Sequence, residues 1–439
     1  MKDNKIKQPT FHGLGIDPSI LRHLTDLKYT IPTPIQQKAI PSGVEGEDII
    51  GIAQTGTGKT LAFAIPVMQQ ISIKKGRGLV LLPTRELALQ VEETFAKLGG
   101  KFGLRTVVLI GGASMHMQRQ RIKNRPHVIV ATPGRLIDHL EQKTISLNDV
   151  KILVLDEADR MLDMGFEPQI KKILATVPSD RQTMLFSATM PEKISQLAKN
   201  YMKQPLRVEV APSGTAAEQI EQEVFFVRKD DKLKLLQQIL TEYKGTVLLF
   251  SRTKYGAKKI NIALKRMGHH SAEIHSDRSL SQRREALDGF KNGKYRILIA
   301  TDIAARGIDV VGIELVINYD LPDQAEDYVH RIGRTGRAGT KGKAIAFAMP
   351  EQKRDVKLIE SLIRVRLPVR SYSQLPEIKE SFVDREPLQR GNRRSQKDHK
   401  DKNNRYQNQS KAGPRNSGQA SRNSRNRRPS RSNSRSKMR

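Results

Sequence analysis

The chain has 439 residues, enough for two or three domains of ordinary size. Lys and Arg total 77 against 46 Asp and Glu, a net charge of +31. This charge disfavours a small-molecule enzyme, because self-repulsion opposes a compact fold. A polyanion, such as nucleic acid or an acidic membrane surface, is the expected partner. The sequence has no cysteine, which excludes disulfides, thiolate metal sites and cysteine nucleophiles. The N-terminus shows no apolar signal core and no run reaches the length of a membrane span, so we expect a soluble, cytoplasmic protein.

Short β-branched runs alternate with amphipathic stretches along most of the chain. Continuously apolar runs are typical of strands buried on both faces of a parallel sheet. The first series of predicted strands is Ile49–Ala53, Leu79–Leu82, Val107–Ile110, Val128–Ala131, Ile152–Leu155 and Met184–Phe186. The second is Val224–Val227, Val247–Phe250, Ile297–Ala300, Leu315–Asn318 and Ala344–Phe347. Predicted helices between them, such as Leu61–Met68, Glu86–Leu98 and Arg284–Phe290, indicate doubly wound α/β layers.

Composition divides the chain into two α/β domains and a tail. A stretch rich in small residues, Pro and Gly at 210–218 is the predicted linker between an N-terminal domain over 1–209 and a C-terminal domain over 219–370. Residues 390–439 hold 12 Arg and 5 Lys against 2 Asp and very few apolar side chains. We therefore predict a disordered, phosphate-seeking basic tail over 371–439, with a purely solubilising tail as the alternative.

A glycine-rich segment, Ala53-Gln-Thr-Gly-Thr-Gly-Lys-Thr60, joins a predicted strand to a predicted helix. Glycines let backbone N–H groups surround phosphates, while Lys59 would reach the β- and γ-phosphates of ATP and Thr60 would bind Mg²⁺. Ala53 stands where the general pattern has Gly, and an ordinary βα loop is the alternative. The candidate ATP ligands of the segment are Ala53, Gln54, Thr55, Gly56, Thr57, Gly58, Lys59 and Thr60.

Carboxylates follow the predicted strand Ile152–Leu155, in the sequence Asp156-Glu-Ala-Asp159. The carboxyl ends of parallel strands are where ligands bind in open α/β folds. Asp156 is a candidate Mg²⁺ ligand, and Glu157 is a candidate general base that orients the attacking water. A solvated acidic turn is the alternative, but the phosphate loop upstream favours the catalytic interpretation.

These segments, in this order, resemble the DEAD-box ATP-dependent RNA helicases of superfamily 2, most like the bacterial RhlE-type branch. Asp156–Asp159 reads D-E-A-D, and the resemblance covers about residues 9–370. The other segments that match family motifs are Pro32–Gln36, Pro83–Ala88, Gly111-Gly112, Thr132–Arg135, Ser187–Thr189, Ala300–Asp309 and His330–Arg337.

Two segments depart from the family pattern. Lys28 precedes the aromatic Tyr29 where the family usually has Gly. After His275, Ser276 replaces a usual Gly, and Leu280 replaces a Gln that stands three residues before Arg283. The second departure puts one polar RNA or interdomain contact in question.

The resemblance implies two tandem RecA-like domains that use ATP and Mg²⁺. By resemblance, Phe11 stacks on the base, Gln36 reads the adenine edge and Asp309 binds the ribose, whereas Arg334 and Arg337 act as arginine fingers. Residues that would couple hydrolysis to RNA are Asp159, Ser187, Thr189 and His330. The alternatives are core packing for Phe11, helix capping for Gln36, strand-end capping for the two hydroxyls, and RNA or surface contacts for the arginines.

The resemblance also assigns two sets of RNA contacts. The first domain would contribute Thr84, Arg85, Gly112, Thr132, Gly134 and Arg135, and the second Arg252, Arg283 and Thr301. Guanidinium, hydroxyl and backbone N–H groups favour phosphate contacts, so we expect sequence-independent, salt-sensitive binding. An ion pair of Arg85 with Glu86 or Glu92 is the alternative for that residue.

We therefore expect an RNA helicase that hydrolyses ATP, with closure of the two domains driving local strand separation in RNA duplexes and RNA–protein complexes. Ribosomal particles and RNA-decay machinery are the expected partners, and a membrane is not. Three other hypotheses remain: a DNA translocase of the same superfamily, an RNA chaperone that works through its basic tail, and an ATP sensor without catalysis.

Overall fold

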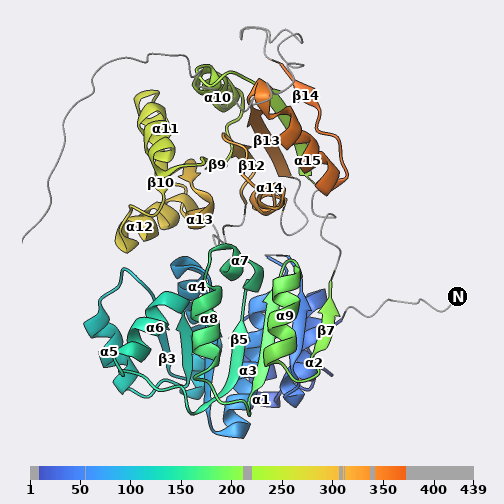
Figure 1. Cartoon of the computed structure of the whole chain (residues 1–439), viewed down its shortest axis with the longest axis vertical. Coiled ribbons are helices and arrows are strands. Elements are labelled where there is room, and N and C mark those ends of the chain that lie inside the picture. Colours follow the sequence, from blue (N-terminus) through green and yellow to red (C-terminus); the bar gives the residue numbers. More distant parts are fainter. Residues whose placement is uncertain are drawn as a thin grey trace, which may run out of the picture. The chain divides into compact units, whose positions relative to one another are not determined.

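The computed structural model describes residues 9–54, 56–210, 220–305, 310, 312–336 and 342–371. Most of the predicted linker and of the basic tail lies outside the described residues, as do Thr55, Asp309 and Arg337. The described chain forms two seven-stranded sheets in which every paired strand is parallel, with helices on both faces (Figure 1). This architecture confirms the predicted fold class of two RecA-like α/β layers.

The first α/β unit has the strand order β3-β4-β2-β5-β6-β1-β7. Its helices are α1 (Pro18–Asp26), α2 (Pro34–Glu45), α3 (Lys59–Lys74), α4 (Arg85–Gly99), α5 (Met115–Lys123), α6 (Pro133–Glu141), α7 (Ala158–Asp163), α8 (Glu167–Leu174) and α9 (Glu192–Tyr201), with a 3-10 turn η1 (Gly100–Phe102). Its strands are β1 (Ile49–Ile52), β2 (Arg77–Leu81), β3 (Thr106–Leu109), β4 (Val128–Ala131), β5 (Val150–Leu155), β6 (Gln182–Ser187) and β7 (Leu206–Glu209).

The second α/β unit repeats this plan with the order β10-β11-β9-β12-β13-β8-β14. Its strands are β8 (Ile220–Phe226), β9 (Val247–Phe250), β10 (Ser271–Ile274), β11 (Ile297–Ala300), β12 (Leu315–Asn318), β13 (Gly342–Ala348) and β14 (Val369–Arg370). Its helices are α10 (Lys232–Glu242), α11 (Lys254–Arg266), α12 (Leu280–Lys291), α13 (Asp302–Ala305), α14 (Ala325–Ile332) and α15 (Lys353–Ile363), with a 3-10 turn η2 (Pro350–Gln352).

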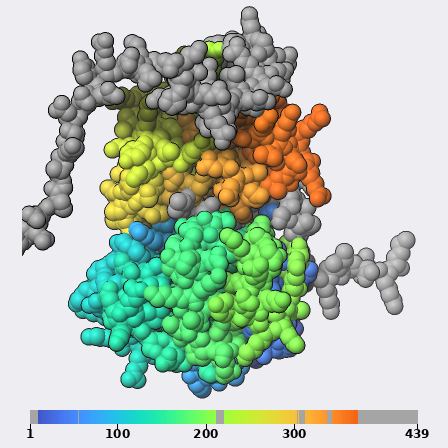
Figure 2. Space-filling view, in the orientation of Figure 1, coloured from blue at the N-terminus to red at the C-terminus, as the bar shows by residue number. Residues whose placement is uncertain are grey.

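The sheets are buried on both faces, which explains why their strands are continuously apolar. In β2, Val80 packs in one hydrophobic cluster with α1 to α4, while Leu79 and Leu81 pack in another with α6 to α9. Figure 1 shows α8 and α9 in front of this sheet, and in Figure 2 the green residues of this part of the chain cover the same face. Alternate side chains of one strand therefore belong to opposite cores, as expected for a doubly wound sheet.

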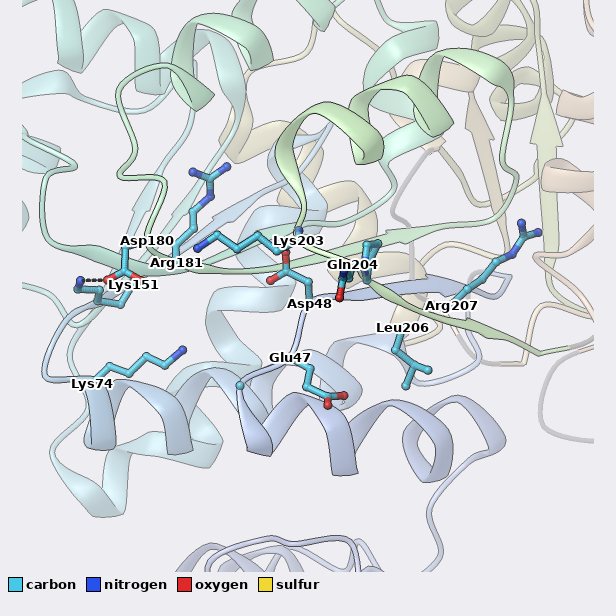
Figure 3. A pocket seen from close by; sticks show the side chains of 12 residues that line it. Glu47, Asp48, Lys74, Lys151, Asp180, Arg181, Lys203, Gln204, Leu206 and Arg207 are labelled. Carbon is cyan, nitrogen blue, oxygen red and sulfur yellow. Dashed lines mark hydrogen bonds and ion pairs between the residues drawn. The ribbon is translucent and has the colours of Figure 1, made fainter.

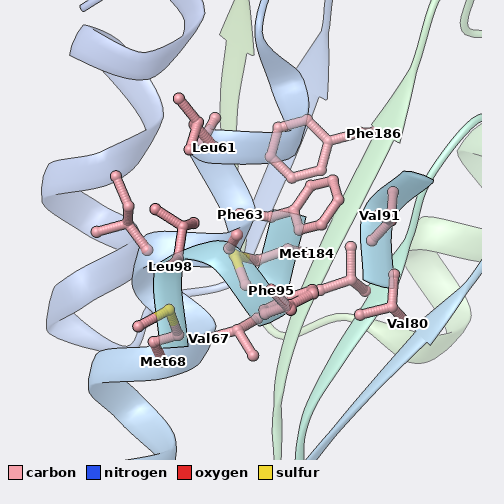
Figure 4. Close-up of a cluster of buried hydrophobic side chains, with 14 of the residues drawn as sticks. Leu61, Phe63, Val67, Met68, Val80, Val91, Phe95, Leu98, Met184 and Phe186 are labelled. Atoms are coloured by element: carbon pink, nitrogen blue, oxygen red, sulfur yellow. The ribbon is translucent and has the colours of Figure 1, made fainter. Parts of the chain in front are cut away.

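An aromatic group anchors the helix that carries the phosphate loop (Figure 4). Phe63 of α3 packs against Phe186 of β6 at 5.6 Å and Phe95 of α4 at 6.4 Å, centroid to centroid. Gly51 of β1 is required here, because a Cβ at that position would overlap the Phe186 ring. This packing fixes the N-terminus of α3 at the carboxyl end of β1.

Three strands are missing from the sequence-based prediction. The strand β7 has the pattern Leu-Arg-Val-Glu with three exposed residues, and β14 is a pair of exposed residues. The strand β10 reads Ser-Ala-Glu-Ile and buries polar side chains. All three lie at sheet edges, and none of them has a continuously apolar sequence. No helix among the described residues is long and apolar enough to cross a bilayer.

Candidate ATP and RNA sites

The phosphate loop lies between β1 and α3, as predicted. Gly56 and Gly58 have φ angles of 87° and 90°, a left-handed conformation that side chains disfavour. Lys59 is buried, and its Nζ donates a hydrogen bond to the Ala53 carbonyl at 2.7 Å, while Thr57 Oγ1 donates to the carbonyl of Gln54 at 2.7 Å. The loop is thus a closed turn with its lysine held at the centre.

Gln36 joins the N-terminus of α2 to this loop. Its Oε1 accepts the backbone N–H of Thr33 at 2.9 Å, and its Nε2 donates to the Gly58 carbonyl at 2.9 Å. Gln36 therefore caps α2, and its recognition of adenine stays a prediction. Phe11 is only 3% exposed and packs in the core with α1 and α2, so the structure shows the packing role and base stacking stays a prediction.

Two neighbouring carboxylates at the end of β5 have opposite pKa shifts. Burial raises the pKa of Asp156 to about 6, although Lys59 opposes the shift. Burial also acts to raise the pKa of Glu157, but Arg160, Lys59, Arg334 and His330 outweigh it and lower that pKa to about 2. Arg160 Nη1 lies 3.4 Å from the Glu157 carboxylate. Environments that separate the pKa values of paired acids are typical of catalytic sites.

The predicted coupling residues of the first unit meet at Asp159. Its carboxylate accepts hydrogen bonds from the backbone N–H of Ala188 at 3.1 Å and from both the N–H and hydroxyl of Thr189 at 2.9 Å. The hydroxyl of Ser187 accepts the Asp159 N–H at 3.2 Å. The end of β6 is therefore tied to the acidic segment after β5 by four hydrogen bonds.

The second unit brings one histidine and one arginine to the same acidic segment. His330 lies in the last turn of α14, and Arg334 follows the end of that helix; both contribute to the electrostatics of Glu157 and line a small cavity together with Arg160. Burial, and then the charge of Arg160, hold the pKa of His330 well below its usual value, so this imidazole is neutral at pH 7. Residues from two separate sheets thus form one charged cluster.

Arg331 is a functional candidate that sequence reasoning missed. Its guanidinium is buried, pairs with both carboxylate oxygens of Asp302 at 2.6 and 2.7 Å, and donates to Asn318 Oδ1 at 2.9 Å. Arg160 was missed as well. The signals available for them were their places inside His330–Arg337 and directly after Asp159.

The predicted RNA residues of the first unit lie at the carboxyl ends of β2, β3 and β4. Arg85 packs against Gly111 and Gly112, where a Cβ on Gly112 would overlap its guanidinium. Arg135 Nη1 donates to the Ala113 carbonyl at 3.0 Å, so both arginines lie against the same loop. Thr84 and Thr132 are the N-cap residues of α4 and α6, and space around Gly134 is open.

Of the three RNA residues predicted in the second unit, two follow the carboxyl ends of strands and one lies within a helix. Arg252 is exposed after β9 and lies 3.4 Å from Asp323, while Thr301 follows β11. Arg283, in contrast, is buried and donates from Nη2 to Glu86 of α4 at 2.8 Å. The two glutamates considered as ion-pair partners of Arg85 have other contacts: Glu86 pairs with Arg283, and Glu92 accepts the Thr106 hydroxyl.

A separate cavity of about 940 Å³ opens at the amino ends of strands in the first sheet, opposite the phosphate loop (Figure 3). Asp48 before β1 accepts backbone N–H groups of Thr183 and Lys203, and Asp180 pairs with Lys151 at 2.9 Å. These residues stand at the amino ends of their strands, so the cavity is not part of the phosphate site.

Comparison with known proteins agrees with this geometry. The profile of the DEAD/DEAH box helicase family matches residues 33–197, and that of the helicase conserved C-terminal domain matches residues 231–339. An ATP-dependent rRNA helicase, RRP3, of Yarrowia lipolytica is 47% identical over 342 residues, covering 77% of this chain and 71% of its own length. The ATP-dependent RNA helicase DbpA of Bacillus subtilis is 43% identical over 80% of this chain and 74% of its own length.

Solved structures are similar over most of the chain. S. cerevisiae Dbp5 bound to RNA and ADP BeF3 has a TM-score of 0.74 at 30% identity, covering 82% of this chain and 95% of that one. Mss116p bound to ssRNA and AMP-PNP has a TM-score of 0.77 at 29% identity, covering 87% and 82%. The two sheets and the phosphate loop define an ATPase with two RecA-like units. The chain belongs to the DEAD-box helicase family, and it is an ATP-dependent RNA helicase that hydrolyses ATP and binds RNA.

The pKa of Asp156 predicts a pH-dependent change in stability. Its pKa rises from 3.8 to about 6 on folding, so between these values the folded state keeps a proton that the unfolded state releases, and stability falls as the pH rises. In EDTA without nucleotide, we expect Asp156→Asn to stabilise the protein by about 3 kcal/mol at pH 8 and by close to nothing at pH 4.

Thermal unfolding at the two pH values measures this difference. Asp288→Asn, which changes an exposed carboxylate of α12, is the matched control and should show no such trend. An Asp156→Asn effect of equal size at both pH values would contradict the proposed burial of a charged carboxylate.

Proposed function

We propose that this helicase couples RNA-stimulated ATP hydrolysis to closure of its two α/β units, and so separates RNA strands locally and remodels RNA–protein complexes. The observation that carries the proposal is the shared charge cluster. Glu157 from the first unit is influenced by His330 and Arg334 from the second, so the hydrolytic site is complete only when both units contribute. A ligand that binds the closed arrangement more tightly than the open one would drive closure.

The charges around Glu157 suggest how hydrolysis would depend on that closure. With a pKa of about 2, Glu157 is a weak base while four cationic or imidazole groups surround it. A triphosphate would bring negative charge to Lys59 and Arg334, reduce their influence and raise the basicity of Glu157 toward the attacking water. Arg334, with Arg337 from outside the described residues, would stabilise the charge that develops on the γ-phosphate.

The donor set fits a magnesium ion that is held mainly by nucleotide. Asp156 and the Thr60 hydroxyl would hold it, and it would neutralise phosphate charge. No group of three His, Asp or Glu side chains that could bind a metal by itself occurs within the part of the chain that the structure describes. This fits Mg²⁺, which keeps several waters and takes phosphate oxygens as ligands.

RNA would lie along the carboxyl edges of the two sheets. Arg85, Arg135 and Arg252, with the backbone at Gly112 and Gly134, would contact phosphates without reading sequence. RRP3 is named as an rRNA helicase and DbpA as an RNA helicase. These names support rRNA within ribosomal particles as a substrate. We also propose a cytoplasmic location; the RhlE-type branch stays a prediction, because these relatives carry other names.

The organisation of the chain completes the proposal. The N-terminal helicase domain would span 1–209, a linker 210–218, the C-terminal helicase domain 219–370, and a basic tail 371–439 that adds RNA affinity. The two family profiles lie within the first and second of these domains.

Substitutions at Lys59 and Glu157 separate binding from chemistry. Lys59→Ala should lose ATP binding, because the buried Nζ is the cation at the centre of the phosphate loop. Glu157→Gln should bind ATP and RNA as the wild type does, while its turnover falls by about 100-fold or more. Fluorescent-nucleotide binding and steady-state ATPase rates measure the two effects. Glu93→Gln, an exposed carboxylate of α4, is the control; normal turnover in Glu157→Gln would remove the assignment of the base.

The high charge of residues 390–439 favours one second candidate function, an RNA chaperone that works through its tail. We expect deletion of residues 385–439 to weaken RNA binding and to lower the salt slope by about 0.7 for each phosphate that the tail neutralises, with RNA-saturated ATPase unchanged. Duplex unwinding, ATPase rates and RNA titrations at several salt concentrations test this. Unwinding that vanishes while RNA-stimulated ATPase persists would favour the chaperone instead.

A further inference from the structure

Leu280, one of the two departures from the family pattern, contacts the first α/β unit. It begins α12 in the second unit, yet its half-buried side chain packs against the hydrophobic cluster that contains Leu87 and Val91 of α4. Capping of α12 does not need it, because Ser279 and Gln282 form a reciprocal capping box. An apolar side chain at this place therefore serves the contact between α12 and α4.

The ion pair one turn further along α12 is buried beside it. Arg283 Nη2 donates to Glu86 Oε2 at 2.8 Å, and both side chains are less than 10% exposed. Burial raises the pKa of Glu86 and lowers that of Arg283. Within the described residues, Glu86 Oε1 and Arg283 Nε form no hydrogen bond. A buried pair with one hydrogen bond gains little net free energy, because desolvation offsets the attraction.

The apolar side chains near the ion pair can contribute the favourable free energy that the pair itself does not. A groove of about 300 Å³ between the two helices is lined by three leucines, Leu89 of α4 and Leu280 and Leu287 of α12, among mostly charged side chains such as Glu92 and Arg284. Removing apolar surface from water is favourable without any orientation requirement, whereas the ion pair fixes orientation. The two interactions are thus complementary parts of one contact.

We propose that Leu280 is a positioning residue for RNA-dependent closure: it holds α12 against the first α/β unit by an apolar contact, and the Arg283–Glu86 ion pair fixes the orientation of the two helices. This inference rests on the proposed closure mechanism. It predicts that the closed arrangement of this chain depends on apolar area as well as on RNA and nucleotide. Leu280 lines the groove beside α4 and not the cavity at Arg160, His330 and Arg334, so it should act on closure rather than on the hydrolytic step.

Titration of the ATPase with RNA tests the role of Leu280. For Leu280→Gln, which replaces the apolar side chain by a polar one of similar length, we expect a roughly three- to tenfold higher RNA concentration at half-maximal stimulation, from loss of part of one leucine's buried area. Turnover at saturating RNA should stay within about twofold of wild type, because enough RNA restores closure. Leu280→Ala should behave similarly, and Leu280→Met should remain close to wild type because it keeps the apolar volume.

Leu358→Gln is the matched control, since Leu358 is 64% exposed on α15 of the same unit and should shift nothing. Equal melting temperatures of all variants would exclude unfolding as the cause. Wild-type turnover that rises with RNA, together with an unshifted Leu280→Gln titration, would overturn this inference alone. Loss of turnover at saturating RNA would also overturn it, because Leu280 would then act on chemistry. A wild-type turnover that is the same with and without RNA would overturn the proposed coupling as well.

Discussion

The structure depends on a buried cluster of opposite charges to which two separate sheets contribute. Three buried carboxylates, Asp156, Glu157 and Asp159, follow β5 of the first unit, and burial disfavours the ionised forms of the first two. Lys59 and Arg160 from the same unit compensate in part, and His330 and Arg334 add the influence of the second. Buried charges persist only where partners are present, so the site itself favours an arrangement in which both units are close.

Helix packing and loop conformation hold this cluster in place. The aromatic contacts of Phe63 fix α3, and left-handed glycines turn the loop so that Lys59 is directed inward. Four hydrogen bonds between Asp159 and residues 187–189 connect the acidic segment to the end of β6. Binding energy at the phosphate loop can therefore reach the neighbouring strand through rigid contacts rather than through flexible side chains.

Sequence patterns predicted most of the fold because parallel strands that are buried on both faces leave continuously apolar runs. The strands that escaped prediction, β7, β10 and β14, are those whose residues are exposed or polar. Sequence motifs also predicted the phosphate loop and the acidic segment, because the residues of each are consecutive and local chemistry fixes their spacing. The Glu86–Arg283 pair could not be predicted, because it joins residues 197 positions apart and depends on how two units meet. The dual use of Gln36, which caps α2 and bonds to Gly58, likewise requires three-dimensional contacts.

Closure of the two units in response to both ligands is the central claim, and the cysteine-free sequence allows a direct measurement. Cysteines introduced at the exposed positions Met117 and Ile262, one in each unit, accept a donor and an acceptor dye for energy transfer. The account predicts that transfer efficiency changes to a new value when RNA and a non-hydrolysable ATP analogue are both present, and changes little with either alone. An efficiency that is the same with both ligands as with none, at saturating concentrations, would contradict it.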